Sequence, residues 1–408
     1  MASLASVTPG SSYPGLIKTI DNLALTTCSQ LSDGCGNALP ISISAQKNSV
    51  SLGSTTNISS GCFSTILGGT GNCALGIYSI AQGNSSCAIN DYGVAMGFRN
   101  TSIKTYGFVF GACNTNDSPN SFNLSTISGG YLNYNCSPLS FIGSGISNRI
   151  EGGSCNVLVG GEQNCIVKLY PGVIASNFIG AGRYNKILAA VTNCVDSIHS
   201  TIAGGCGNVI CGSQFGTIPG GAFNRVDNAA QVVVGGGISA GGAFNIVSSD
   251  DGSILAGRSN TVTGCKSSII GGIGNNVSGF NSGIFNGCGN IVSSCYSSVL
   301  GGSSNTACLP YSAVFNGCCN VSAGSFSSVL AGANNCAIGD YSTIFGGQLN
   351  SATCANSGVF GCGITSRMSC AFHTNRIVVT QLPSSSAGLP SGAMWYDPAA
   401  GNVVKYVP

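Results

Sequence analysis

Apolar and polar positions repeat along most of this chain with a period of 14 or 15 residues. In the clearest part, an Asn recurs every 15 residues from Asn245 onward. An apolar, β-branched residue stands six positions before each Asn from Asn260 onward, and a second apolar residue often stands two positions after it. A unit this short cannot hold two helices, and β-branched residues favour strands. The pattern predicts an all-β parallel β-solenoid with two short strands in each coil.

The position six residues before the aligned Asn should fill the interior of the coil. These predicted core residues are Ile66, Ile80, Val94, Ile254, Ile269, Ile284, Val299, Val314, Val329 and Ile344.

The aligned residue marks a turn. A Gly three positions earlier is nearly constant within the chain, which predicts a positive φ or a close backbone approach there. Copies of the Asn should stack along the solenoid as an amide ladder, although a plain turn residue would fit the same pattern. The predicted ladder consists of Asn260, Asn275, Asn290, Asn305, Asn320, Asn335 and Asn350.

The repeat sets the domain boundaries. Aligned residues with a period of 14 precede the regular run, and spacings of 15 to 23 residues between the two indicate coils with insertions. We expect an N-terminal attachment or capping segment at 1–60 and about 18 to 19 coils at 61–370. Strands at 376–382, 393–397 and 403–407 should form a C-terminal β cap at 371–408, because an open coil exposes strand edges.

A second apolar position predicts self-association. The residue after the inner Ile or Val is also large and apolar, and neighbouring residues of a strand point to opposite faces. One face can fill its own coil, whereas the other needs a partner. We expect an intertwined or side-by-side homotrimer with these residues on its axis: Leu255, Ile270, Phe285, Leu300, Phe315, Leu330 and Phe345.

Composition limits the classes of molecule that this chain is expected to bind. Charged residues make up 6% of the chain, the net charge is +2, and the 62 Gly residues argue against long helices. Without a basic run, we expect no nucleic-acid partner, and without a long apolar stretch we expect no membrane insertion. The first residues lack a basic region followed by an apolar one, so no signal peptide is expected.

Catalytic chemistry is not indicated. His199, placed in an insertion loop, and His373 lie far apart, and the adjacent Asp250 and Asp251 should point away from each other. We therefore expect no enzyme, no cofactor and no metal site. The 22 Cys residues are interpreted as buried apolar fillers, with a Cys73–Cys87 disulfide as the best alternative pair.

Aromatic residues form a smaller repeat. Tyr78, Tyr92 and Tyr106 recur every 14 residues and should stack between coils. A sugar-binding platform is the alternative interpretation.

The units YSIAQGNSS (78–86) and YGVAMGFRN (92–100) resemble the head repeats of trimeric autotransporter (YadA-type) adhesins. This similarity covers roughly residues 60 to 370 and implies a left-handed β-roll. The flanks at 19–44 and 375–408 resemble the ends of fibre proteins of tailed phages, especially marine ones. No coiled-coil stalk or membrane anchor of the adhesins is recognisable, which favours the phage resemblance.

Together these patterns predict a structural virion fibre protein, on tail or capsid, that binds other virion proteins through its N-terminal region and contacts a host surface receptor or glycan. A cellular adhesin or extracellular filament subunit is the alternative. A fibre-borne depolymerase would need clustered carboxylates, and ice binding would need a flat Thr array. Host contact is expected on the insertions or the C-terminal cap, with candidate residues Lys168, Tyr170, Asp196, His199, Arg225 and Asp227.

Overall fold

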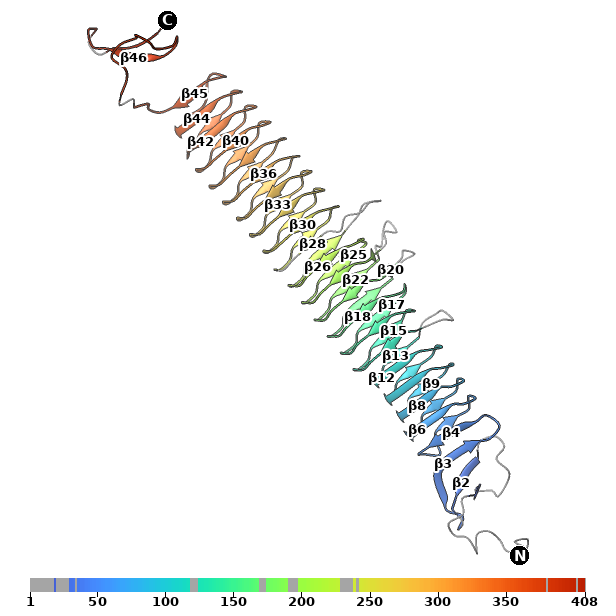
Figure 1. Cartoon of the computed structure of the whole chain (residues 1–408). Helices are drawn as coiled ribbons and strands as arrows, with labels where there is room; N and C mark the ends of the chain where they lie inside the picture. Colours follow the sequence, from blue (N-terminus) through green and yellow to red (C-terminus); the bar gives the residue numbers. More distant parts are fainter. Residues whose placement is uncertain are drawn as a thin grey trace, which may run out of the picture.

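The computed structural model of the chain is a straight parallel β-solenoid of about 20 turns (Figure 1). It describes residues 18–19, 29–33, 35–117, 124–168, 174–189, 197–227, 238–239, 242–378, 381–400 and 403–407. All regular elements within these ranges are strands. No helix in the described part has the length and apolarity needed to cross a lipid bilayer. The all-β solenoid prediction is thereby confirmed.

Antiparallel strands cover the N-terminal end of the roll. Successive antiparallel pairings join β1 (Lys18–Thr19), β2 (Ser29–Ser32), β3 (Ala38–Ser44) and β4 (Ser49–Leu52). The other edge of β4 pairs in parallel with the first coil. The parallel stack therefore starts at β4, which lies inside the range 1–60 that was predicted to be a separate N-terminal segment.

The first stack continues with one parallel strand from each turn. Its strands are β6 (Thr65–Thr70), β8 (Ile80–Asn84), β10 (Val94–Phe98), β12 (Phe108–Ala112), β14 (Thr126–Ile127), β16 (Phe141–Ile142), β18 (Val157–Leu158), β21 (Phe178–Ile179), β24 (Thr201–Ile202), β26 (Thr217–Ile218), β28 (Ile238–Ser239), β30 (Ser253–Ile254), β32 (Ser268–Ile269), β34 (Gly283–Ile284), β36 (Ser298–Val299), β38 (Ala313–Val314), β40 (Ser328–Val329), β42 (Thr343–Gln348), β44 (Gly358–Cys362) and β45 (Phe372–Thr374).

The second stack runs beside the first. Its strands are β5 (Ile58–Ser59), β7 (Cys73–Ala74), β9 (Cys87–Ala88), β11 (Thr101–Ser102), β13 (Thr115–Asn116), β15 (Tyr134–Cys136), β17 (Arg149–Glu151), β19 (Cys165–Val167), β22 (Lys186–Leu188), β25 (Val209–Cys211), β27 (Arg225–Asp227), β29 (Ile246–Val247), β31 (Thr261–Val262), β33 (Asn276–Val277), β35 (Ile291–Val292), β37 (Thr306–Ala307), β39 (Val321–Ser322), β41 (Cys336–Ala337) and β43 (Ser351–Ala352).

Two further strand pairs lie outside these stacks. In the central coils, β20 (Ile174–Ala175) pairs in parallel with β23 (Ser197–Ile198). Near the C-terminus, β46 (Met394–Asp397) and β47 (Val403–Tyr406) form an antiparallel hairpin. The described part of the predicted strand 376–382 contains no strand. The hairpin lies apart from β45 instead of covering the last coil (Figure 1), which differs from the predicted C-terminal cap.

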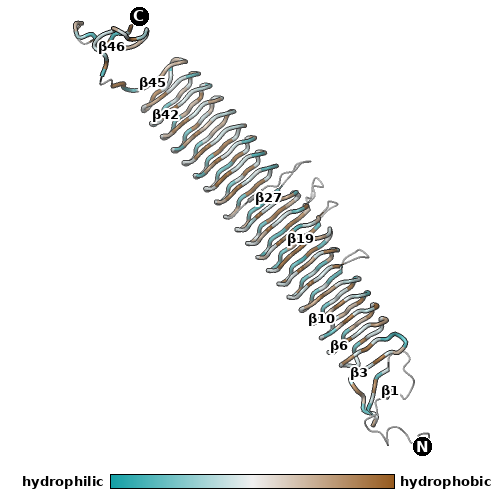
Figure 2. The backbone as a smooth tube through the Cα atoms, viewed as in Figure 1, coloured by the Kyte–Doolittle hydropathy of each residue, from teal (hydrophilic) through white to brown (hydrophobic). Residues whose placement is uncertain are grey.

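A narrow apolar core runs through the whole roll. The predicted core residues Ile66, Ile254, Ile269, Ile284, Val299, Val314, Val329 and Ile344 are at most 1% exposed. The second stack contributes the facing residues, such as Val262 and Val292. Hydrophobic segments accordingly recur from turn to turn in Figure 2. Most described apolar residues of the interior are Ile, Val or Ala, and Leu158 is an exception.

Two predicted core residues were wrong. Ile80 and Val94 lie on the outer side of their strands and are partly exposed, whereas Ala81 and Ala95 are fully buried. The register shows the reason, since Ile66 pairs with Ala81 and the pairing shifts between Ile66 and Gly69. A 14-residue coil lacks one residue between its inner position and the Gly. Counting back from the aligned residue therefore reaches the wrong side of the strand.

Buried side-chain amides connect each coil to the next. The backbone N–H of Asn305 donates to Oδ1 of Asn290 (2.9 Å), and Oδ1 of Asn305 accepts the N–H of Asn320 (3.0 Å). Its Nδ2 donates to the carbonyls of Gly301 (2.9 Å) and Gly317 (3.0 Å). The seven predicted ladder residues are all at most 1% exposed. The Asn is thus an internal ladder and not a plain surface turn residue.

The corner that presents this Asn needs an unusual backbone. Gly302 has a φ of 88°, and a Cβ there would overlap the carbonyl oxygen of Gly317 in the next coil. Ser304, directly before the Asn, has a φ of 57°. Both features predicted for the Gly, a positive φ and a close approach, are present.

A second internal ladder lies at the opposite corner. Ser267, Ser282, Ser297 and Ser312 are at most 6% exposed, and each of the last three donates its backbone N–H to the hydroxyl of the Ser one coil earlier. Over these coils, both corners are therefore held by polar side chains that form hydrogen bonds with a neighbouring coil.

We predict that Asn275→Ala lowers the free energy of unfolding by about 3 kcal/mol, because it leaves buried backbone groups of two coils without partners. The amide of Asn275 contacts Gly271, Gly287 and Asn290. Asn276→Ala is the matched control, since Asn276 is exposed. Urea unfolding followed by circular dichroism measures both, and equal losses would contradict the ladder's role.

Candidate self-association face

The outer face of the first stack carries an exposed apolar column. Each member follows a buried residue, as Leu300 follows Val299, and so points outward. The predicted members Leu255, Ile270, Phe285, Leu300, Phe315, Leu330 and Phe345 are 37–54% exposed. Phe360 continues the column and was missed by sequence reasoning, although it stands 15 residues after Phe345 with the same preceding pattern. We call these eight residues the apolar column.

Small residues flank the apolar column on the same face. The residue two positions earlier in each strand is Ser268, Gly283, Ser298, Ala313 or Ser328 in the central part of the column. At its C-terminal end, a Cβ on Gly358 would press on the rings of Phe345 and Phe372, which meet edge to face at 6.0 Å. The column is therefore a ridge beside a shallow strip of small residues.

Stacked aromatic rings line one corner of the roll at two places. Phe63, Tyr78, Tyr92 and Tyr106 form one ladder, with ring centroids 4.8 to 5.3 Å apart. Tyr296, Tyr311, Phe326 and Tyr341 form the other, at 4.5 to 5.0 Å. The predicted Tyr ladder is present. Because neighbouring rings cover each other's faces, the ladders expose ring edges, so a sugar could stack only on a terminal ring.

The candidate receptor-contact residues do not form one site. Lys168 and His199 are exposed, and His199 stacks on Phe215 with ring centroids 5.4 Å apart. His199 follows β23 directly, at a corner with a φ of 55°, so it differs from the loop placement predicted for it. Arg225 forms an ion pair with Asp227, which raises the pKa of the guanidinium. Tyr170 and Asp196 lie outside the described residues.

Other titratable residues give no catalytic constellation in the described part of the chain. Burial and the neighbouring Asp251 raise the pKa of the Asp250 carboxyl. No group of three or more His, Cys, Asp and Glu side chains within the described ranges is arranged to hold a metal ion.

The cysteines were placed wrongly by sequence reasoning. Every described cysteine is a free thiol, and each is exposed or partly exposed. Four of them stand directly after the aligned Asn or its equivalent, where the side chain points outward: Cys73, Cys87, Cys165 and Cys336. They are outer-face residues and not core fillers. Cys73 and Cys87 are register partners on β7 and β9, as the disulfide alternative required, but they are unbridged here.

Cys87 should react slowly with iodoacetamide at pH 8. Partial burial and the hydrogen bond with Cys73 raise the pKa of its thiol to about 11, and only the thiolate is nucleophilic. Its alkylation rate should keep rising up to about pH 11. Peptide mass mapping of a time course, with exposed Cys62 as reference, tests this; equal rates for Cys62 and Cys87 at pH 8 would contradict it.

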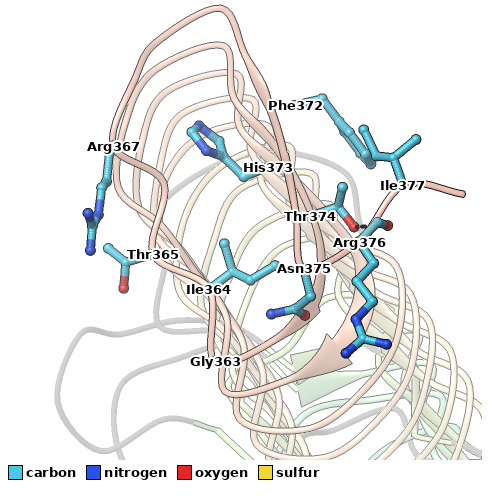
Figure 3. A pocket seen from close by; sticks show the side chains of 10 residues that line it. All are labelled: Gly363, Ile364, Thr365, Arg367, Phe372, His373, Thr374, Asn375, Arg376 and Ile377. Carbon is cyan, nitrogen blue, oxygen red and sulfur yellow. Dashed lines mark hydrogen bonds between the residues drawn. The ribbon is translucent and has the colours of Figure 1, made fainter. Parts of the chain in front are cut away.

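The last coil leaves an open mouth. A cavity of about 630 Å³ is lined by Gly363, Ile364, Thr365, Arg367, Phe372, His373, Thr374, Asn375, Arg376 and Ile377. Ile364 takes the ladder position after Asn350 and ends the amide ladder, and His373 pairs with Val359 at an inner position. The guanidinium groups of Arg367 and Arg376 lie on opposite sides of the mouth (Figure 3), so they do not converge on one ligand.

Asn375 finishes the edge of the last coil. Its Oδ1 accepts the N–H of Cys362 (2.6 Å), and its Nδ2 donates to the carbonyl of Cys362 (3.2 Å). The side chain thereby makes the two hydrogen bonds that a further strand would make. The cavity is thus the open end of the strand stack, where an Asn side chain again forms hydrogen bonds with backbone groups of the neighbouring coil.

Comparison with known proteins gives no family assignment. No protein-family model matches the sequence, and no curated protein is significantly similar to it.

Proposed function

We propose that this protein is the subunit of a structural virion fibre, in which three copies of a left-handed roll associate side by side through the apolar column. The exposure of that column on a regular rod is the observation that carries the proposal. About 20 turns at roughly 4.8 Å per turn give a roll on the order of 100 Å long, which suits a spacer or a projecting fibre.

The chemistry of the roll favours side-to-side association. Its backbone hydrogen bonds run along the axis from coil to coil, so the sides offer side chains and not strand edges. Eight large apolar residues follow one line over about 34 Å, and a contiguous exposed apolar surface is typical of an interaction site. Parallel copies in register would bring identical columns together on a common axis, without like charges in the column to oppose them.

The two ends of the roll differ, which supports a fibre with one attachment end and one projecting end. Antiparallel strands close the N-terminal end, and we assign attachment to other virion proteins to this region. The C-terminal end would project toward the host. A surface receptor or glycan would be contacted by the C-terminal segment or by the insertions of the central coils near Lys168, His199 and Arg225. The resemblance of the flanks to phage fibre ends supports this assignment. The alternative remains a cellular adhesin or an extracellular filament subunit.

Ile270→Lys should dissociate the assembly, whereas Ile338→Lys should not. The two isoleucines are 42% and 47% exposed, but Ile270 belongs to the apolar column and Ile338 lies after β41 on the other stack. Three lysines brought together on an axis lose hydration and repel one another. Sedimentation velocity should give trimers for the wild type and Ile338→Lys and monomers for Ile270→Lys. A wild-type protein that stays monomeric would refute the proposal.

An antibody against the roll should label purified phage particles at a fibre in electron micrographs. The alternative predicts labelling of cell-surface filaments in cultures that contain no particles. A particle preparation that lacks this chain by peptide mass mapping would contradict the virion assignment but not self-association.

A further inference from the structure

The C-terminal hairpin has two chemically different faces. In its antiparallel register, Met394 is opposite Tyr406 and Tyr396 is opposite Val404, so these four side chains share one face. Met394, Val404 and Tyr406 are 52%, 55% and 72% exposed. We call these four residues the hairpin apolar face. It contains no charged residue.

The other face is closed by contacts within the hairpin. Lys405 forms an ion pair with Asp397 (2.6 Å) and lies over the ring of Trp395, 5.7 Å from its centroid. The ion pair lowers the pKa of Asp397. Val403 lies on this face too, at 51% exposure. The hairpin therefore has one face with an internal ion pair beside the exposed Val403 and one apolar face without a charge.

The roll of the same chain does not cover the hairpin apolar face. In Figure 1, a stretch of chain separates the hairpin from β45. Within the described residues, the backbone hydrogen bonds of the hairpin reach no further back than Pro383. A two-stranded hairpin is marginally stable by itself in water. This hairpin needs another surface that is permanently present beside it.

We propose that the hairpin apolar faces of neighbouring copies pack on one another and lock the C-terminal end of the assembly. This inference rests on the proposed side-by-side association. The face has no charge to select a different partner, and an equivalent apolar surface exists on every copy. Parallel copies in register also bring their hairpins to the same height.

The size of the face sets the order of assembly. Four side chains bury at most a few hundred Å², well below the roughly 800 Å² per partner of a stable complex. The hairpin therefore cannot hold free chains together. Once the apolar column holds the copies, the effective concentration of the hairpins reaches the millimolar range, and a weak contact suffices. The small area of the hairpin apolar face therefore favours a second copy of this chain as its partner, because the apolar column already holds that copy nearby.

A matched pair of substitutions tests the lock. Val404→Lys places a charge on the hairpin apolar face, and Val403→Lys places the same charge on the opposite face at nearly equal exposure. Trp395 is the only Trp in the chain, so its fluorescence reports the hairpin selectively. Urea unfolding of the full-length protein is followed by Trp395 fluorescence at several protein concentrations, with sedimentation velocity alongside.

The wild-type Trp395 transition should move to higher urea as protein concentration rises. In assembled protein, Val404→Lys should weaken hairpin folding at least about tenfold while the rolls stay associated, and Val403→Lys should have no such effect. Assembled protein in which both variants match the wild type, or lose equally, would overturn the hairpin lock and leave the proposed self-association intact. A wild-type chain that is monomeric at all concentrations would overturn both.

Discussion

The buried Asn amide is the interaction on which the rest of this structure depends. One side chain satisfies carbonyls in its own coil and in the next, and it accepts the backbone N–H of the following Asn. A buried amide with missing partners is costly, so a coil cannot be stable without a neighbour. Stability must then grow along the stack, as it does in other repeat proteins. The same constraint fixes the corner backbone, with Gly302 and Ser304 at positive φ.

Since the ladder fixes only the corners, the chain between them can vary. Asn185 and Asn208 are 23 residues apart, yet the N–H of Asn208 donates to Oδ1 of Asn185 at 3.1 Å, as in the regular coils. The ladder hydrogen bonds are thus kept across coils that differ in length, and lengthening a loop adds little entropy cost. The hydrogen-bonded roll and the segments that differ in length are thereby separated. This separation would let a fibre change its surface contacts without changing its shaft.

Sequence reasoning correctly predicted the features that repeat with the ladder, and it failed where a coil differs from the others by one residue. The period, the Asn positions and the inner column from Ile254 to Ile344 follow directly from the repeat. Ile80 and Val94 misled it because they are more hydrophobic than Ala81 and Ala95, which fill the core in the shorter coils. The cysteines were assigned to the core because cysteine is a small apolar residue. Only the strand register shows that the side chain of Cys73 points outward. The hairpin faces likewise required the pairing of Met394 with Tyr406.

The outer face of the first stack carries apolar residues in two columns. One column precedes the inner residue, as Phe108, Phe141 and Phe178 do, and the other follows it, as Leu67, Val159 and Leu255 do. The two columns lie on one face, two residues or roughly 7 Å apart. A partner lying straight along the roll could cover only one of them. A partner that crosses the face obliquely would cover both, so the proposed side-by-side packing of straight rolls covers the apolar column alone.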